Sequence, residues 1–402
     1  MPRKPMAGGR IGELMKELSL AAVMETIPQS AVDQALNKTG TESKRQRRLP
    51  APLVVYLVIL LALFADVSVR ENLRILLETL RRRFDLEPLK PAVGSAITKA
   101  RQRLGRAPFA QLFNAVAQPL GEESLPGCYW RGFRVVAVDG TSADVQNTPA
   151  NRARYGLHTN QHGEVGYPAL KAVVLLECGT RAPLDAATGG EHDGEGALFD
   201  RLRDRLDKGM LLLADRYYYS FERFQDCAAR AGALVWRVNK SLKLTPRRVF
   251  ADGSFLAEIR PSYKLTHNGR SAKGECLTVR VVEYEPLFED GTTGEQTRLL
   301  TTLLDPNEAS AEKLAGLYPE RWNEETGYDE LKTHLRGPGR VLRGQLPDLV
   351  EQEFFGFLLA YYVVRATMVQ AAKRNKVAPN ELSFVHAVRV IKRKLAFPPT
   401  DV

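Results

Sequence analysis

Four side chains with useful chemistry lie at fixed offsets between residues 318 and 332. They read Tyr318-x2-Arg321-x3-Glu325-x6-Lys332, which is one aromatic ring, two cations and one carboxylate in a segment that we expect to be a single helix. Offsets of three, four and seven residues return to nearly the same face of a helix. A carboxylate flanked by cations makes a poor apolar face, but it can hold a metal ion beside phosphate groups.

Two further carboxylates stand upstream, each after an apolar run typical of a buried strand. Asp139 follows Arg134-Val-Val-Ala-Val, and Asp215 follows Met210-Leu-Leu-Leu-Ala. Residues just past strand ends line the ligand-binding crevice of α/β sheets, so adjacent strands could bring both side chains together, with Glu325 supplied by a packed helix. Converging carboxylates repel one another, and a divalent cation removes that penalty. Oxygen ligands select Mg²⁺ or Mn²⁺, and two ions about 4 Å apart can hold the attacking and leaving oxygens of a phosphodiester.

Each aspartate taken alone has a simpler explanation. Asp139-Gly140 is a common turn dipeptide, and Asp215-Arg216 could be a helix N-cap or a surface ion pair. The combination of both aspartates with the helical motif favours a shared site.

The charge of the chain favours a polyanionic partner. The 402 residues carry a net charge of +10, and residues 1–120 hold 19 Lys and Arg against 10 Asp and Glu. Nucleic acid is the leading candidate for the partner, and a solubilising surface charge is the alternative. The basic runs Lys44–Arg48 and Arg81–Arg83 suit DNA recognition and equally suit solvated helix ends.

Cysteine usage and apolar runs suggest a protein of a reducing cytosol. The four cysteines lie about fifty residues apart without a Cys-x-x-Cys pair, which argues against zinc and against a disulfide framework. No secretory signal is visible after Met1. The apolar runs Ala51–Ala65 and Phe354–Val364 fall short of the ~20 residues of a membrane span, so we expect two buried helices.

The pattern of hydrophobic residues divides the chain into four parts. Residues 1–125 read as a basic, all-helical DNA-binding domain, and residues 126–237 as the first part of a mixed α/β domain. Residues 238–305 read as a β-rich insertion between the second aspartate and Glu325. Residues 306–402 read as the helical remainder, with Glu325 and the C-terminal helices.

These motifs resemble those of the DDE transposases of the insertion-element-4 family. That family carries the signature Y-(2)-R-(3)-E-(6)-K, which the residues from Tyr318 to Lys332 match. The segments Val136–Thr141, Leu213–Ser220 and Val350–Tyr361 are similar to the family as well. The resemblance extends from about residue 30 to the C-terminus, and the signature with both aspartates upstream is highly specific.

The resemblance implies an α/β, RNase H-like mixed-sheet catalytic domain of the retroviral-integrase superfamily, with a β-rich insertion and a preceding all-helical domain. It implies that Asp139, Asp215 and Glu325 bind two Mg²⁺ ions, for which Mn²⁺ can substitute. It also implies cut-and-paste transposition, in which activated water nicks the element's end and the freed 3′-OH attacks DNA. Relatives use that hydroxyl to form a hairpin before they join target DNA.

The resemblance also implies partners and a location. The partners are double-stranded DNA, both the terminal inverted repeats and the target, and a second copy of the chain in a dimeric synaptic complex. The expected location is the bacterial cytoplasm, at the nucleoid and without a membrane. Two alternatives stay open: an RNase H-like nuclease without strand transfer, and an inactive DNA-binding derivative of a transposase.

Several side chains near the carboxylates receive roles by the same resemblance. Tyr318, Arg321 and Lys332 are expected to hold backbone phosphates near the scissile bond. Arg216 matches the family and could contact DNA or form a structural ion pair. Tyr217 stands where relatives often have a small residue, and its ring could pack in the core or line a DNA groove. Two tryptophans read as structural: Trp236 in a core strand, and Trp322 beneath the site.

Overall fold

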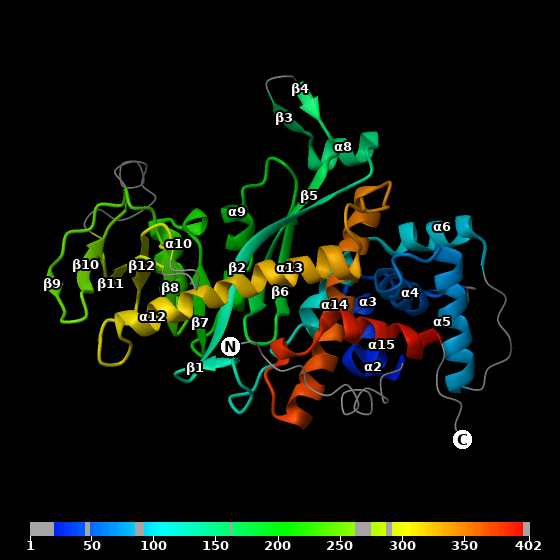
Figure 1. Cartoon of the computed structure of the whole chain (residues 1–402). Helices are drawn as coiled ribbons and strands as arrows, with labels where there is room; N and C mark the ends of the chain where they lie inside the picture. The colour runs from blue at the N-terminus through cyan, green and yellow to red at the C-terminus, as the bar shows by residue number, and fades with distance from the viewer. Residues whose placement is uncertain are drawn as a thin grey trace.

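The computed structural model describes residues 20–44, 49–84, 92–160, 163–261, 275–286 and 292–396. Helices gather at one end of the molecule and a large sheet at the other (Figure 1). The N-terminal helices are α2 (Leu20–Thr26), α3 (Gln29–Lys38), α4 (Ala51–Leu63), α5 (Val69–Phe84), α6 (Gly94–Leu104) and α7 (Ala107–Val116). Pro52 lies in the first turn of α4, where a backbone N–H is not needed for the helix.

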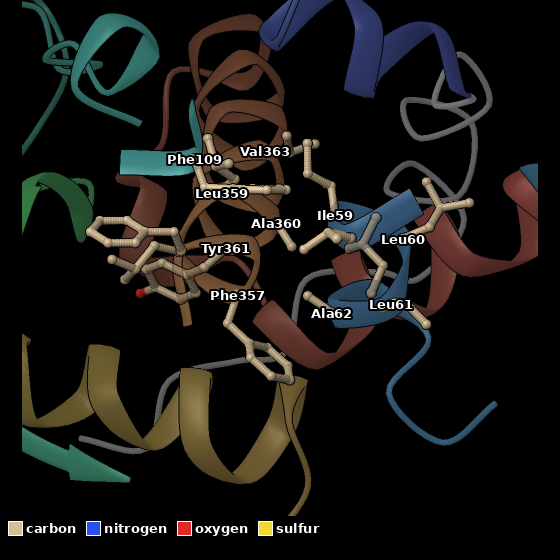
Figure 2. Close-up of a cluster of buried hydrophobic side chains, with 14 of the residues drawn as sticks. Ile59, Leu60, Leu61, Ala62, Phe109, Phe357, Leu359, Ala360, Tyr361 and Val363 are labelled. Carbon is tan, nitrogen blue, oxygen red and sulfur yellow. The ribbon is translucent and has the colours of Figure 1, made fainter. Parts of the chain in front are cut away.

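Two helices that are apolar nearly all round form the centre of this helical part. They are α4 and α14 (Pro347–Asn375), and Figure 2 shows Ile59 of α4 close to Ala360 and Val363 of α14. A Cβ on Gly356 of α14 would lie 2.8 Å from Cγ1 of Val58, so only glycine permits this close crossing. One hydrophobic core contains residues of α2 to α7 together with residues of α14 and α15 (Phe384–Ala396). The C-terminal helices therefore share a core with the N-terminal helices, which the division at residue 125 did not anticipate.

The helix α14 is longer than the apolar run that predicted it. It has 29 residues and is long and apolar enough to cross a membrane, but 89% of its most apolar 18-residue window is buried inside the protein. Its polar residues Gln352 and Arg365 are also fully buried and form hydrogen bonds within the fold. The prediction of a buried helix is confirmed.

The strands of the described residues form one ten-stranded mixed sheet with the order β6-β5-β2-β7-β8-β12-β11-β10-β9, and β1 pairs with β2. β2 and β5 are antiparallel, as are β5 and β6, whereas β7 runs parallel to both β2 and β8. This order and these directions are those of an RNase H-like sheet, so the predicted fold class is confirmed. The strands are β1 (Tyr129–Trp130), β2 (Phe133–Asp144), β5 (Ala169–Glu177), β6 (Ala182–Gly189), β7 (Met210–Ala214) and β8 (Ala233–Arg237).

The strands of the predicted insertion extend the same sheet. β12 (Thr297–Thr301) pairs antiparallel with β8, and β11 (Leu277–Tyr284), β10 (Phe255–Ile259) and β9 (Arg248–Val249) follow in order. A separate hairpin of β3 (His158–Asn160) and β4 (Gly163–Val165) follows α8 (Pro149–Tyr155). The β-rich block is thus a continuation of the catalytic sheet beyond β8.

Helices cover both faces of the sheet. The alternation of side chains along β2 shows which helices cover which face. Val136 and Val138 share a core with α9 (Glu195–Asp200) and α10 (Phe221–Arg230). Val135 and Ala137 point the other way and share a core with α12 (Ala311–Leu317). Because successive side chains of a strand face opposite sides, Asp139 continues the row that faces α12 and the helical segment after it.

Candidate active site

The segment that carries the four-residue signature is helical throughout, but its winding changes. α12 leads into a 3-10 turn, η3 (Tyr318–Trp322), then α13 (Asn323–Asp329) and a π-helical turn, η4 (Glu330–Leu335). Figure 1 shows this gold segment crossing the sheet. The signature residues differ in burial, because Tyr318 and Arg321 are both 7% exposed while the side chain of Glu325 is 60% exposed. The prediction of a helix is confirmed, and the contact between Arg321 and Glu325, four residues apart, agrees with a shared face for these two residues.

Asp139 and Asp215 lie in neighbouring positions at the point where β2 and β7 part. The last register pair of these parallel strands is Val138 with Ala214, and the next residue on each strand is an aspartate. Two carboxylates that are distant in sequence are therefore next to each other on the sheet. This agrees with the expectation that adjacent strands bring them together.

The two aspartates end their strands differently. β2 was expected to end at Asp139, but it continues to Asp144, and Asp139 lies opposite Val174 of β5. The expectation of a strand end is wrong because β5 continues to pair with β2 after β7 has stopped. Asp215 does follow the end of its strand and caps the 3-10 turn η2 (Arg216–Tyr218), where its Oδ1 accepts a 3.3 Å hydrogen bond from the Tyr217 N–H.

Two tyrosine hydroxyls fasten the helical segment to these strands. Tyr318 donates to the carbonyl oxygen of Ala214 over 3.4 Å, and Tyr328 donates to the carbonyl oxygen of Asp139 over 2.7 Å. Burial raises the pKa of both hydroxyls, so both remain donors at neutral pH. Tyr328 was not singled out from the sequence, although it stands in the same motif three residues after Glu325.

Arg321 lies between two of the three candidate carboxylates. Its Nη1 is 3.1 Å from Oδ2 of Asp139, and its Nη2 is 3.3 Å from Oε1 of Glu325. Burial opposes the charged form of this guanidinium, but Tyr318 and the carboxylates around it raise the pKa of Arg321 overall. The phosphate contacts expected of Tyr318 and Arg321 stay a prediction, and both side chains are buried and bonded within the protein.

A fourth carboxylate approaches Asp139 from the opposite face of the sheet. A Cβ on Gly140 would lie 2.4 Å from the carboxyl carbon of Glu195, so this approach requires glycine at that position. Glu195 also accepts a 3.2 Å hydrogen bond from the hydroxyl of Tyr218. Burial raises the pKa of Asp139, the Gly140 N–H and Arg321 lower it, and Glu195 and Glu325 raise it further. The glycine after Asp139 is the sequence feature that permits this approach, and a turn was the alternative explanation for it.

Glu324 is a buried acid directly beside the candidate ligand Glu325. It is fully buried, and neither of its carboxylate oxygens has a hydrogen-bond partner in the part of the chain that the structure describes. Burial, and then the charge of Asp139, raises its pKa well above the ordinary value of 4.5. The sequence gave no reason to separate Glu324 from its acidic neighbours.

The donor set suits a divalent cation in its chemistry. Asp139, Asp215 and Glu325 offer hard oxygen ligands from three elements that meet at one place on the sheet. Within the described residues, however, no three His, Cys, Asp or Glu side chains are gathered closely enough to hold a metal ion as they stand. Cations of the protein are nearby instead: Arg321 bridges two of the carboxylates, and Nη1 of Arg237 is 4.0 Å from Oδ2 of Asp215.

The two predicted cations that remain are Lys332 and Arg216, and both have neighbours within the protein. Lys332 and Arg336 border a cavity of about 20 Å³ that Thr141 also lines, and the Lys332 ammonium is 5.9 Å from the Tyr328 ring. Burial and then the charge of Arg336 lower the pKa of Lys332. Nη1 of Arg216 is 3.9 Å from Oε2 of Glu295. This is a weak ion pair, and an ion pair was one of the two roles expected of Arg216.

The aromatic residues near the site separate into core and surface. Trp236 is fully buried and donates its indole N–H to the carbonyl oxygen of Asp215 over 2.9 Å, which confirms the prediction of a core residue. Tyr217 is 78% exposed, so its ring does not pack in the core. Trp322 is 50% exposed, so the expectation that it packs beneath the site is wrong; the buried residues of η3 are Tyr318 and Arg321.

The basic runs of the N-terminal part cannot be placed in the same way. Residues 45–48 of the first run, and the side chains of the run 81–83, lie outside what the structure describes. Their predicted contact with DNA therefore stays a prediction.

Comparison with known proteins finds transposase relatives along most of the chain. Residues 17–114 match the family model of the insertion element 4 transposase N-terminal region, and residues 130–363 match that of the transposase DDE domain. The chain is 28% identical over 384 residues to transposase InsG for insertion sequence element IS4 of Escherichia coli (strain K12), which covers 94% of this chain and 83% of that protein. It is 29% identical over 209 residues to putative transposase InsZ of the same organism, covering 52% and 67% of the two chains.

A solved structure with a similar course of the chain is the cryo-EM structure of a piggyBac transposase synaptic complex with hairpin DNA. The likeness has a TM-score of 0.46 and 10% identity, and it covers 94% of this chain and 80% of the other. The fold assignment rests on the strand order and not on this likeness. The DDE-domain match spans more than half of the chain, and the chain therefore belongs to the DDE transposases of insertion sequences, enzymes that cleave DNA and transfer its strands.

Proposed function

We propose that Asp139, Asp215 and Glu325 are the metal-binding carboxylates of this transposase, with Mg²⁺ as the natural ion and Mn²⁺ as a substitute. The observation that carries the proposal is the register of β2 and β7, which makes the two aspartates neighbours. Divalent ions held by these residues would activate the attacking hydroxyl and stabilise the leaving oxygen of the phosphodiester.

The surrounding side chains set the geometry of the carboxylates. Tyr318 and Tyr328 fix the helical segment to β7 and β2, and Trp236 holds the backbone of Asp215. We assign Tyr318 a positioning role and not a phosphate contact, because its ring is buried and its hydroxyl already donates inside the protein. Such positioning matters because small displacements of reacting groups cost large factors in rate.

DNA contacts fall to the cations that remain accessible. Lys332 borders the cavity beside β2, Arg216 follows Asp215 directly, and the basic helices of residues 1–125 would read the ends of the element. The substrate is double-stranded DNA, both terminal inverted repeats and target. A homodimer would pair two ends in a synaptic complex, and the enzyme would work at the nucleoid in the bacterial cytoplasm.

The test is a strand-cleavage and joining assay with labelled duplexes that carry the element's ends. Wild-type protein with Mg²⁺ should yield joined products, whereas cleavage without joining would favour the nuclease alternative. Asp139→Asn, Asp215→Asn and Glu325→Gln should each abolish cleavage, while Asp204→Asn, whose side chain is 89% exposed, should leave it unchanged. Retention of cleavage in the three variants would refute the assignment of the carboxylates.

A further inference from the structure

We propose that Arg321 is an internal counter-ion of the acidic site, and that it releases Asp139 and Glu325 to a divalent cation by changing its own partner to Glu324. The inference rests on the proposed function, because it takes Asp139 and Glu325 as metal ligands. It goes further by giving the metal-binding event a defined movement of a protein side chain.

The first arrangement is the one that the structure contains. The guanidinium of Arg321 donates to Asp139 over 3.1 Å and to Glu325 over 3.3 Å, and its side chain is only 8% exposed. A planar guanidinium presents several donors, so one arginine can bridge two carboxylates that would otherwise repel. Arg321 thus holds the first and the last acid of the triad together.

A divalent cation and the guanidinium compete for these two carboxylates. Mg²⁺ requires its oxygen ligands at about 2.0–2.1 Å, and a neighbouring positive charge on the same oxygens repels it. The positive charge of Arg321 therefore opposes metal binding, and a movement of Arg321 away from the two carboxylates should favour it.

The second arrangement could use Glu324 as the acceptor. Glu324 is fully buried, and neither of its carboxylate oxygens makes a hydrogen bond of ordinary geometry among the described residues, although the Asp139 N–H lies close enough to lower the pKa of Glu324. Nε of Arg321 is likewise a buried donor without a partner. Glu324 is three residues after Arg321 and Glu325 is four, so one side chain can reach either acid from the same helical segment. Unpaired buried polar groups are costly, and a pair between Arg321 and Glu324 would remove that cost.

The test measures Mn²⁺ binding by the full chain through the electron paramagnetic resonance of free Mn²⁺, together with thermal unfolding in EDTA and in Mn²⁺. Arg321→Met removes the competitor, so Mn²⁺ should bind about tenfold more tightly, the factor expected for one lost charged contact. Its unfolding temperature should fall in EDTA and recover in Mn²⁺.

Glu324→Gln removes the second partner of Arg321, so Mn²⁺ should bind about threefold to tenfold more weakly, without a lower unfolding temperature in EDTA. Arg230→Met, which removes a cation that pairs with Asp204 and Asp226 at the end of α10, should match wild type in Mn²⁺ binding.

Two outcomes separate the inference from the proposed function. If Asp139→Asn loses Mn²⁺ binding while Arg321→Met binds Mn²⁺ no more tightly than wild type, the counter-ion role is overturned and the metal site stands. If wild type binds no Mn²⁺, or Asp139→Asn binds it equally well, both are overturned. Should Arg321→Met fail to fold, Arg321→Gln decides the question, because its amide can still donate hydrogen bonds but carries no charge, and this variant should also bind Mn²⁺ more tightly than wild type.

Discussion

The hydroxyl of Tyr328 donates a 2.7 Å hydrogen bond to the carbonyl oxygen of Asp139 and so joins the helix of the last carboxylate to the strand of the first. Tyr318 makes the matching contact with the residue before Asp215. The position of Glu325 relative to the two aspartates is therefore set by buried tyrosines, and not by the carboxylates themselves, whose charges would drive them apart.

Tyr328→Phe tests this positioning. Loss of the hydroxyl leaves the Asp139 carbonyl without its partner, so we expect unfolding to become easier by about 1 kcal/mol. Cleavage should slow about tenfold, because the helix that carries Glu325 is held less firmly. Urea denaturation and single-turnover cleavage measure the two effects. Tyr217→Phe, at a ring that is 78% exposed, is the matched control, and equal effects in both variants would contradict the positioning role.

A buried ion pair anchors the end of the same helical segment to α14. Glu330 contacts Arg365, which is fully buried, and Glu330 also accepts a 2.8 Å hydrogen bond from Tyr361. Glu330→Gln should cost about 3–5 kcal/mol, because it leaves the Arg365 charge buried without compensation.

A double-mutant cycle with Arg365→Met measures this coupling. The double variant should lose less stability than the sum of the two single variants, because the contact is shared. The exposed pair of Arg230 with Asp204 serves as control, where Asp204→Asn should cost under about 1 kcal/mol. Additive losses at Glu330 and Arg365 would show that the pair is not coupled.

Trp236 supports Asp215 from the core. Trp236→Phe removes the 2.9 Å hydrogen bond to the Asp215 carbonyl and leaves a void among buried side chains, so stability should fall by about 1–3 kcal/mol. Trp322→Phe, at a half-exposed ring, should change stability by less than about 0.5 kcal/mol. Chemical denaturation measures the stability of both variants. A larger loss for Trp322→Phe than for Trp236→Phe would contradict the supporting role of Trp236.

The burial of Glu324 predicts a pH dependence of stability. Its pKa in the folded state is raised well above the ordinary 4.5, so the folded protein holds this proton more tightly than the unfolded chain does. That contribution is complete below pH 4.5 and is lost as pH rises through the folded-state pKa. Glu324→Gln removes the ionisation, so its stability relative to wild type should increase as pH rises above 4.5. A constant difference across this range would mean that Glu324 ionises freely in the folded protein.

Lys332 should contribute to DNA affinity through charge and not through sequence. Lys332→Ala should weaken binding to specific and random duplexes alike, and should reduce the slope of log K against log salt by about 1. Lys208 is a suitable control, because it donates to the carbonyl of Ala231 near the opposite end of β7. A salt slope that Lys332→Ala leaves unchanged would remove Lys332 from the phosphate contacts.

Much of the site could be predicted because it depends on patterns of residues that are close in sequence. The apolar run before Asp215 predicted β7, and the spacing from Tyr318 to Lys332 predicted a helix with a functional carboxylate. Both are short-range properties, in which the period of side chains and the identity of neighbours decide the outcome.

Other features depend on partners distant in sequence, and the sequence could not supply them. β2 continues past Asp139 because β5 pairs with it there, and Trp322 is half exposed while Tyr318 and Arg321 of the same turn are buried. The sharing of one core by α14 and the N-terminal helices likewise follows from packing between elements nearly three hundred residues apart.

The sequence by itself determined the family and the sheet class, and it predicted which carboxylates share a site, since these follow from residue types in a fixed order. Only the tertiary structure decided which of the acidic side chains are paired with a cation. Arg321 pairs with Asp139 and Glu325, whereas Glu324, next to Glu325 in the chain, is fully buried and unpaired. Burial and the direction of a side chain depend on the packing of several elements at once, and no spacing along a single segment contains that information.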